Sequence, residues 1–174
     1  MEVLEAIRTR RSIRQFENRP VPEDLVEKLL RAAMSAPSAR NSQPWYFIVL
    51  TDRQLLQQAS TVNPYARMAA TAPLAILVCA DARLEKSPGY WPVDCAAAVQ
   101  NMLLAAHGLG LGAVWTGVWP REERMNGFRR LFNLPEPVIA HSMVVVGYPA
   151  ERPLPEDRYQ PERVHHNGWK PNTK

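Results

Sequence analysis

The sequence predicts a layered domain of the α/β or α+β class, without a regular alternation of strands and helices. The chain has 174 residues, which suits one domain, and 46% of them are hydrophobic, so it can bury a core. Segments with apolar residues at helical spacing are interleaved with short β-branched and aromatic runs. A single domain is therefore expected over residues 1–174.

Helices are expected where apolar residues recur every three or four positions. From Pro22 to about Met34 this pattern follows a proline and includes two acidic residues near its start, which favour a helix N-terminus. Residues 2–10 form a shorter amphipathic helix that carries arginines at its C-terminal end. Further helices are expected at 53–60, 65–71, 93–107 and 122–131.

The helix from Val93 to His107 is apolar almost all round. Such a helix is buried on several sides, either inside a large core or across a subunit interface. In a chain this short, the interface is the favoured alternative. Glycines at 108, 110 and 112 end the helix.

Four short runs rich in β-branched and aromatic residues are expected to form buried strands. They are bounded by proline, glycine or aspartate. The runs are Trp45–Leu50, Leu74–Cys79, Ala113–Trp119 and Ile139–Val146.

The composition changes beyond Gly147, where five prolines fall among charged residues. Residues 148–174 are therefore not expected to pack as a helix and are either disordered or an extended arm laid on another surface. Tyr148, Tyr159, Val164 and Trp169 offer apolar anchors, which favours the arm.

Net charge, cysteine content and the absence of long apolar runs bear on nucleic-acid binding, metal binding and localisation. The formal net charge of +4 is no larger than the arginine cluster itself, which favours a local anion site over a nucleic-acid-binding face. Cys79 and Cys95 lie in apolar runs without metal-ligand spacing, so they are expected to be free thiols and no metal site is predicted. The N-terminus does not resemble a secretory signal and no run suits a membrane span, so a cytoplasmic protein is expected.

The run Arg8, Arg10, Arg11, Ser12 and Arg14 concentrates four guanidiniums and a hydroxyl within seven residues. Like charges at this density repel one another unless an anion lies among them. Arginine matches phosphate oxygens two at a time, and a serine hydroxyl adds a short-range donor. A phosphate site is one interpretation, and a solvated basic turn or a polyanion-binding arm is the other.

The loop PSARNSQPW at 37–45 crowds hydroxyl and amide groups between a predicted helix and a predicted strand. Ser38, Asn41, Ser42 and Gln43 can both donate and accept hydrogen bonds, which suits the edge of a heterocycle. The alternative is an ordinary helix end followed by a turn.

A third segment, Ala113–Trp119, places Gly117 inside a strand pattern with a tryptophan on either side. A glycine there allows close approach to the backbone, and Trp115 and Trp119 offer large apolar walls. The alternative is a bulge with tryptophans in the core. The sequence shows no phosphate-binding Walker loop, dinucleotide fingerprint or protein-borne nucleophile, so an enzyme built on this chain would use a cofactor.

Together these segments resemble the FMN-dependent nitroreductase family, in particular its short members. The matching pieces are RRSIRQF at 10–16, PSARNSQPW at 37–45, DCAAAVQNMLLAAHGLGLG at 94–112, WTG at 115–117, GYP at 147–149 and DRY at 157–159. They follow the family's order over nearly the whole chain.

The resemblance implies a three-layer α+β fold, with a mixed or antiparallel sheet flanked by helices. It also implies an intertwined homodimer that exchanges its extended C-terminal arms, about 148–174, and holds two FMN sites at the interface. In that scheme the phosphate, the ribityl chain and the pyrimidine side of FMN are lined by Arg10, Arg11, Ser12 and Arg14, and Arg158 closes on the phosphate. The ring is reached from the other subunit by Pro37, Ser38, Ala39 and Asn41. Its N5 and O4 atoms lie at Trp115, Thr116 and Gly117, and its N1 and O2 atoms lie near Arg67. Glu156 departs from the larger relatives, which commonly have a basic residue there.

The resemblance further implies an oxidoreductase that transfers hydride from NAD(P)H through FMN to a small aromatic, nitroaromatic or quinone-like acceptor, with ping-pong kinetics. Dehalogenation, flavin fragmentation and heterocycle dehydrogenation use the same scaffold and stay open. A nucleic-acid-binding module that uses the basic N-terminal segment is the alternative from another class.

Overall fold

The computed structural model describes residues 1–169 of the chain. Five α-helices and four β-strands form the domain. They are α1 (Val3–Thr9), α2 (Glu23–Met34), β1 (Trp45–Leu50), α3 (Arg53–Val62), β2 (Leu74–Asp81), α4 (Trp91–Gly108), β3 (Gly112–Gly117), α5 (Glu122–Phe132) and β4 (Val138–Gly147). The strands make one antiparallel sheet in the order β1-β2-β4-β3.

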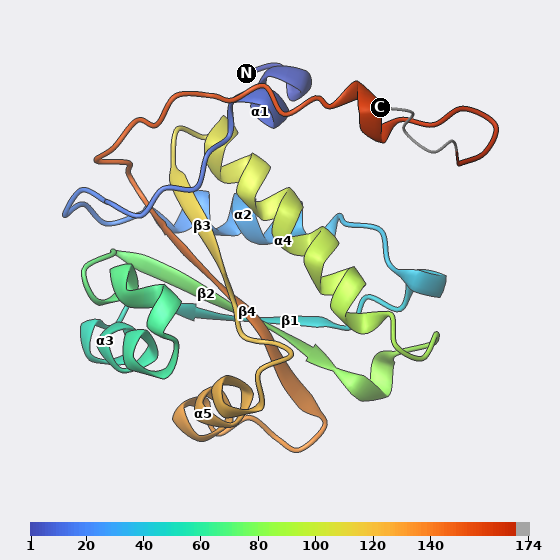
Figure 1. The fold of residues 1–174 in the computed structure, drawn as a ribbon. Helices are drawn as coiled ribbons and strands as arrows, with labels where there is room; N and C mark the ends of the chain where they lie inside the picture. The colour runs from blue at the N-terminus through green and yellow to red at the C-terminus, as the bar shows by residue number, and fades with distance from the viewer. Residues whose placement is uncertain (170–174) are drawn as a thin grey trace.

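Helices cover both faces of the sheet, with α2 and α4 on one side and α3 and α5 on the other (Figure 1). Alternate residues of β2 contact opposite layers: Ile76 and Val78 pack toward α2 and α4, whereas Ala75 and Leu77 pack toward α3 and α5. Because both faces are covered, every residue of β2 is buried. The expected three-layer α+β fold is confirmed.

Two expected elements differ in detail. The helix expected at 65–71 is a 3-10 helix over Pro64–Ala70, entered through Asn63, whose side chain accepts a hydrogen bond from the N–H of Tyr65. The strand expected over 113–119 ends at Gly117, because the N–H groups of Val118 and Trp119 both donate to the carbonyl of His141. The other expected helices and strands form within a few residues of their predicted bounds.

Helix α4 packs one side against the sheet and leaves the other side open in the single chain. Within α4, the side chains of Ala98, Val99 and Met102 are fully buried, whereas those of Val93 and Gln100 are exposed. The apolar character all round the helix is therefore not explained by the core of one chain. No helix within residues 1–169, α4 included, has the length and hydropathy needed to cross a membrane.

The segment after β4 is extended, as the proline content predicts. It begins by pairing with residues 15–17: Phe16 bridges Pro149, and the N–H of Ala150 donates to the carbonyl of Gln15. It then passes α1 and projects beyond the body of the domain (Figure 1). Of the four expected anchors, Tyr148 is partly buried, and Tyr159, Val164 and Trp169 are exposed. Arm residues 170–174, which include Pro171, lie outside the described residues.

The two cysteines are buried free thiols on neighbouring layers, Cys79 in β2 and Cys95 in α4. Burial raises the pKa of the Cys79 thiol to about 12 and raises that of Cys95 as well. Both side chains are therefore protonated and apolar at neutral pH.

Candidate functional site

The arginine run leaves α1 and lies along the outer edge of β3. Ser12 bridges Ala113 in a parallel arrangement, and the N–H of Ile13 donates to the carbonyl of Ala113 at 3.0 Å. Gly112 makes this approach possible, because a Cβ atom there would lie 2.7 Å from the Ile13 side chain. Gly112 thus allows the arginine segment to dock on the sheet.

At this edge the guanidiniums of Arg10 and Arg11 lie near that of Arg158, which comes from the extended segment after β4. Burial, followed by the positive charges of Arg158 and Arg11, lowers the pKa of the half-buried Arg10 from its ordinary value. Glu156 lies between two of them, with Arg11 and Arg158 each 3.1 Å from its carboxylate. Arg11 also donates to the carbonyl of Leu154. The structure thus brings Arg158 to the N-terminal arginines, as the resemblance implies.

The guanidinium of Arg10 donates to no hydrogen-bond acceptor within the described part of the chain, although its backbone N–H bonds to the carbonyl of Ala6. Its guanidinium is half-buried among other positive charges, so an anion at this position would relieve both repulsion and lost hydration. The charge balance of the cluster is three cations against the single carboxylate of Glu156. This excess of donors suits a phosphate.

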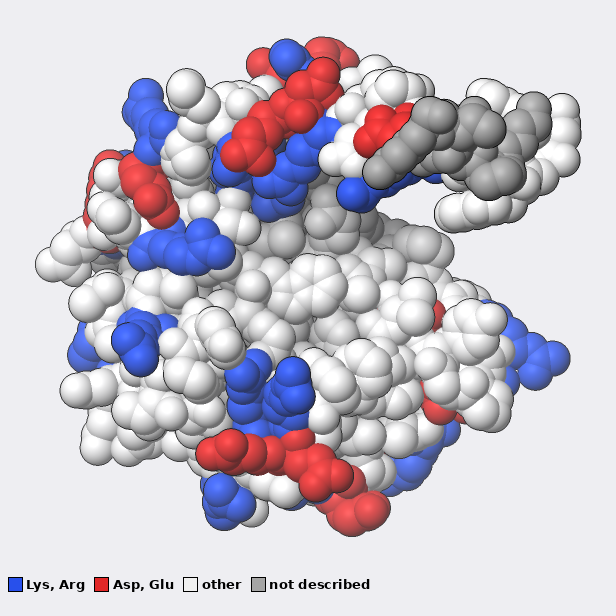
Figure 2. Space-filling view, viewed as in Figure 1, with Lys and Arg blue, Asp and Glu red and all other residues white. Residues whose placement is uncertain are grey.

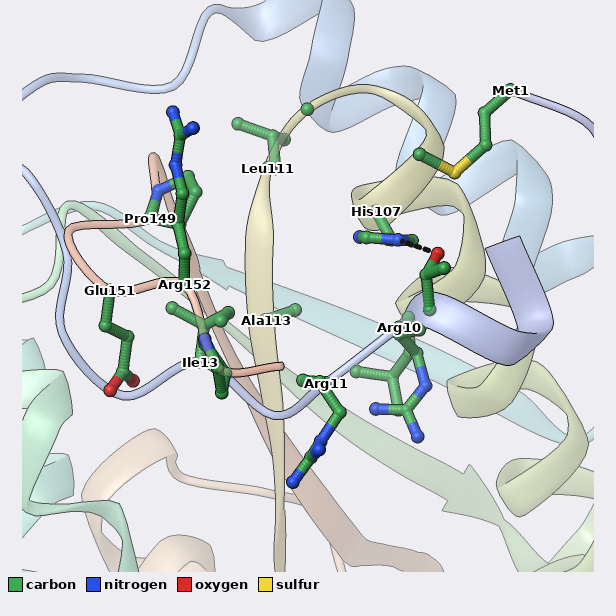
Figure 3. Close-up of a pocket in the computed structure, with 14 residues that line it drawn as sticks. Met1, Arg10, Arg11, Ile13, His107, Leu111, Ala113, Pro149, Glu151 and Arg152 are labelled. Atoms are coloured by element: carbon green, nitrogen blue, oxygen red, sulfur yellow. Dashed lines mark hydrogen bonds between the residues drawn. The ribbon is translucent and has the colours of Figure 1, made fainter. Parts of the chain in front are cut away.

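A cavity of about 420 Å³ opens beside this cluster (Figure 3). Arg10 and Arg11 extend to one side of it and Arg152 to the other, and Leu111 contributes to its apolar wall. His107, from the end of α4, lies 2.8 Å from the Thr9 hydroxyl, measured from Nε2 to Oγ1. Sequence reasoning missed Arg152 because it lies in the proline-rich segment between GYP and DRY, the two pieces there that resemble the family.

Arg14 and Ser12 are placed differently from Arg10 and Arg11. The Arg14 side chain is exposed and does not line the cavity, although its backbone N–H donates to Glu151. Ser12 is partly buried at the β3 edge and also lies outside the cavity lining. The structure therefore groups Arg10, Arg11 and Arg158 and leaves Arg14 apart.

The outer edge of β3 continues the site beyond the arginines. Because the carbonyl of Ala113 accepts the hydrogen bond from Ile13, the backbone N–H and C=O of Ala113 point away from β4. By the alternation of an antiparallel strand, the backbone groups of Trp115 and Gly117 point the same way. Trp115 and Gly117 therefore present backbone groups at an edge that no strand covers. The Thr116 side chain is buried and donates to the carbonyl of Met143, so its hydroxyl is not available to a ligand at this edge.

Two donors hold the end of this edge in place. The carbonyl of Gly117 accepts hydrogen bonds from Asn63 Nδ2 at 3.1 Å and Arg124 Nη1 at 2.9 Å. Sequence reasoning identified neither Asn63 nor Arg124 as a site residue. Arg67 lies on the 3-10 helix that follows Asn63, exposed and with no ion pair inside the described ranges.

The loop after α2 has an unusual backbone. Arg40, Asn41 and Gln43 adopt left-handed φ values of 53°, 53° and 46°. Such conformations are costly for residues other than glycine and concentrate at functional sites. The Ser38 hydroxyl accepts from the N–H of Gln43, while Pro37 and Asn41 are exposed.

Asp94 holds this loop against the start of α4. Its buried carboxylate accepts hydrogen bonds from the N–H of Ala39 at 2.8 Å and from the Ser42 hydroxyl at 3.0 Å. Sequence reasoning did not identify Asp94, although a single carboxylate in an apolar helix was the available signal. The loop is thus an ordered structure with a buried anchor.

The structure does not bring the loop and the arginine cluster together within one chain. The loop is tied to Asp94 at the start of α4, and the arginine segment is tied to His107 at its end through Thr9. Thirteen residues of helix separate these two positions by about 20 Å. The loop and the arginines accordingly lie at opposite ends of α4 (Figure 1).

Comparison with known proteins gives consistent matches. The model of the nitroreductase family matches residues 7–70 and 53–148. A protein of Methanothermobacter thermautotrophicus, provisionally named NADH dehydrogenase/NAD(P)H nitroreductase, is 55% identical over 97% of this chain and 88% of that protein.

Solved structures agree with this match. A crystal structure from Parabacteroides distasonis with the same provisional name has a TM-score of 0.92 and 42% identity, covering 96% of this chain and 98% of that one. A protein of Desulfovibrio desulfuricans, provisionally named a nitroreductase and crystallised in complex with FMN, has a TM-score of 0.84 and 32% identity, covering 98% and 99%.

Proposed function

Because the chain belongs to the nitroreductase family, we propose that it is an oxidoreductase that binds FMN between two copies of itself and carries electrons from NAD(P)H to a small aromatic, nitroaromatic or quinone-like acceptor. The observation that carries this proposal is the half-buried, unpartnered guanidinium of Arg10 beside the open edge of β3. Bound FMN would supply the hydride transfer that no side chain of the site provides. The protein's own residues bind and orient.

The cofactor phosphate fits the arginine cluster. Arg10 and Arg158 offer planar donor forks, and Arg11 is released to the anion when Glu156 moves aside. Arg152 lines the same cavity from the opposite side and adds positive charge. Ser12 lies on the route from the cavity to the β3 edge, where it suits a sugar-like hydroxyl chain.

The ring edge of the cofactor fits the backbone of β3. Trp115 presents its N–H and C=O groups there and Gly117 presents its N–H, because the Gly117 carbonyl is already bonded to Asn63 and Arg124. Gly117 also has no Cβ to hold a flat molecule away. A Cβ built on Gly117 would meet no atom within 4 Å, so the space beside it is open. Arg67 is free to turn toward the pyrimidine end, where positive charge stabilises a reduced ring.

A second copy of the chain would complete the site. The loop 37–43 and the arginines lie at opposite ends of α4, so a twofold pairing with antiparallel α4 helices brings the loop of one copy to the arginines of the other. The open side of α4 then becomes the interface. Figure 2 shows that the middle of this face is uncharged and that charged side chains concentrate around its margins.

Exposed apolar side chains at both ends of the chain also favour a homodimer. Leu4 in α1 is 80% exposed, and Leu154 and Trp169 in the extended segment are 82% and 85% exposed. Large apolar groups at this exposure mark an interaction surface when they gather together. The extended segment therefore suits exchange between two copies, in which these side chains pack on the partner.

The two substrates would use the same open face of the site in turn, which gives ping-pong kinetics. No side chain need act as a general acid in this scheme, because solvent can supply the protons. Two buried free thiols suit a reducing compartment, and we place the enzyme in the cytoplasm, where NAD(P)H is available.

Flavin content tests the proposal directly. The purified protein should be yellow, with about one FMN per chain by absorbance, and the double change Arg10→Ala, Ser12→Ala should leave it colourless. Arg8→Ala is the matched control, because Arg8 is exposed on α1 and should leave the flavin in place. A wild-type protein that is colourless and takes up no added FMN would overturn the proposal.

A further inference from the structure

His107 lies on the wall of the arginine-lined cavity and has no part in the phosphate binding described so far. It is the second-last residue of α4 and lines the cavity together with Arg10 (Figure 3). Histidine is the side chain whose ordinary pKa allows it to gain or lose a proton close to neutral pH. A partly buried imidazole beside a guanidinium therefore bears on how strongly this cavity binds an anion.

The hydrogen bonds of Thr9 determine which ring nitrogen of His107 carries hydrogen. The Thr9 hydroxyl has a single hydrogen, which it donates to the carbonyl of Glu5 at 2.7 Å. Its oxygen lies 2.8 Å from Nε2 of His107 and can only accept there, so Nε2 is the donor. In the uncharged ring Nδ1 then carries a lone pair. Nδ1 has no hydrogen-bond partner within residues 1–169, so an additional proton would bind at this atom.

Charges of both signs act on this ring. Burial and then the positive charge of Arg10 lower the pKa of His107, whereas the carboxylate of Glu5 acts in the opposite direction. The C-terminal end of α4 also favours a positive charge on the ring. The other charged residues on the cavity wall are Met1, with its terminal amino group, Arg11, Glu151 and Arg152. The repulsion by Arg10 is the part of this balance that an anion bound to Arg10 would remove.

We propose that His107 is a proton-accepting member of the phosphate site, which takes up one proton at Nδ1 when a phosphate monoester dianion binds to Arg10. The inference rests on the proposed function and adds a residue to the same site. The proton comes from solvent, and no covalent bond of the phosphate changes. The dianion cancels the repulsion by Arg10 and attracts the imidazolium, so the charged ring becomes favourable only in the complex.

Anion binding and protonation of His107 are then coupled, and each makes the other more favourable. Because the complex holds more protons than the flavin-free protein, the affinity for FMN should fall as the pH rises. The phosphate of FMN contributes little to this change above about pH 6.5, because a phosphate monoester loses its second proton near pH 6 and is already mostly dianionic there. The pH dependence therefore reports on the protein.

Titration of flavin-free protein with FMN tests the inference, with quenching of flavin fluorescence as the signal. The Kd of the wild type should rise about 5-fold between about pH 6.5 and about pH 8.5, which is a typical size for coupling between two sites. His107→Gln keeps a donor for Thr9 but cannot take up the proton, so its Kd should change less than about 2-fold. The control His166→Gln, an exposed histidine away from the cavity, should behave like the wild type.

Riboflavin has the same ring and sugar chain as FMN but no phosphate, so it separates the coupling from a general effect of pH on the fold. Its Kd for the wild type should stay constant over the same pH range. This comparison needs no variant and so does not depend on the folding of His107→Gln. Calorimetry of FMN binding in buffers of different ionisation enthalpy should show net proton uptake by the wild type and none by His107→Gln.

Three results would overturn the inference: an FMN affinity of the wild type that does not change with pH, an equal change in His107→Gln, or an equal change for riboflavin. Each of them leaves the proposed function standing, because FMN still binds. A wild type that binds no FMN at any pH would overturn both.

Discussion

The carboxylate of Glu156 lies 3.1 Å from the guanidinium of Arg11 and so places an anion of the chain itself inside the arginine cluster. The hydrogen bond from Arg158 and the charge of Arg11 hold the pKa of Glu156 below its ordinary range. The carboxylate is thus ionised at neutral pH and occupies donors that a phosphate would use.

Removing this internal anion should strengthen cofactor binding. Glu156→Gln should lower the Kd for FMN by about 3-fold, a small effect because exposed ion pairs are weak. The measurement is quenching of FMN fluorescence during titration into flavin-free protein. Glu162→Gln, an exposed carboxylate in the same segment, should have no effect, and weaker binding by Glu156→Gln would contradict the competition.

Gly117→Ala should weaken FMN binding about 10-fold and leave the melting temperature of flavin-free protein unchanged. The added methyl group meets no atom within 4 Å, and the φ of Gly117 is not in the left-handed region. The substitution should therefore not lower the stability of the flavin-free protein. The methyl group instead enters the space proposed for the ring edge. Gly108→Ala, also in open space at the end of α4, should bind FMN normally. Normal FMN binding by Gly117→Ala would contradict the proposed position of the ring at this edge.

Asp94→Ala should destabilise the protein by about 1–3 kcal/mol, because it leaves the N–H of Ala39 and the hydroxyl of Ser42 without their acceptor. FMN retention should also fall, since the loop loses its anchor. Urea unfolding and flavin content measure the two effects. Asp24→Ala removes an exposed pair with Lys28 and should change stability far less.

Acid should destabilise the protein through His141. In the unfolded chain this side chain takes up a proton near pH 6.5, whereas in the fold its pKa is about 4, so the unfolded state binds more protons between these values. The contribution of the uncharged His141 ring to the free energy of unfolding is complete above about pH 6.5 and decreases by about 3 kcal/mol as the pH falls to 4. His141→Gln should flatten this dependence in urea unfolding, and His166→Gln, an exposed histidine, should not.

The local sequence was sufficient for most of the fold. The periodicity of 22–34 and the β-branched runs at 74–79 and 139–146 predicted α2, β2 and β4, because these segments are either clearly amphipathic or continuously apolar. The strand end at Gly117 was less predictable, because it depends on the carbonyl of His141, which lies 24 residues away in the sequence.

The site was predictable only in part. Arg10 and Arg11 were marked by their density in the sequence, and Arg158 only by family resemblance. Asn63, Asp94 and Arg124 were not identified, because their roles depend on hydrogen bonds to segments that only the fold brings to them. The sequence analysis assigned no role to His141, whose place in an aromatic cluster depends on tryptophans from two other segments.

The sequence alone marked the arginine run as a candidate anion site and showed no protein-borne nucleophile or metal-ligand spacing, and its resemblance to the nitroreductase family indicated flavin chemistry. Tertiary structure decided how the parts are distributed. It placed the arginines and the polar loop at opposite ends of α4, inserted Glu156 among the guanidiniums and brought His107 to the wall of the arginine-lined cavity. Residue type sets which interactions a side chain can make, but only the packing of distant segments sets its neighbours and the solvent that it loses.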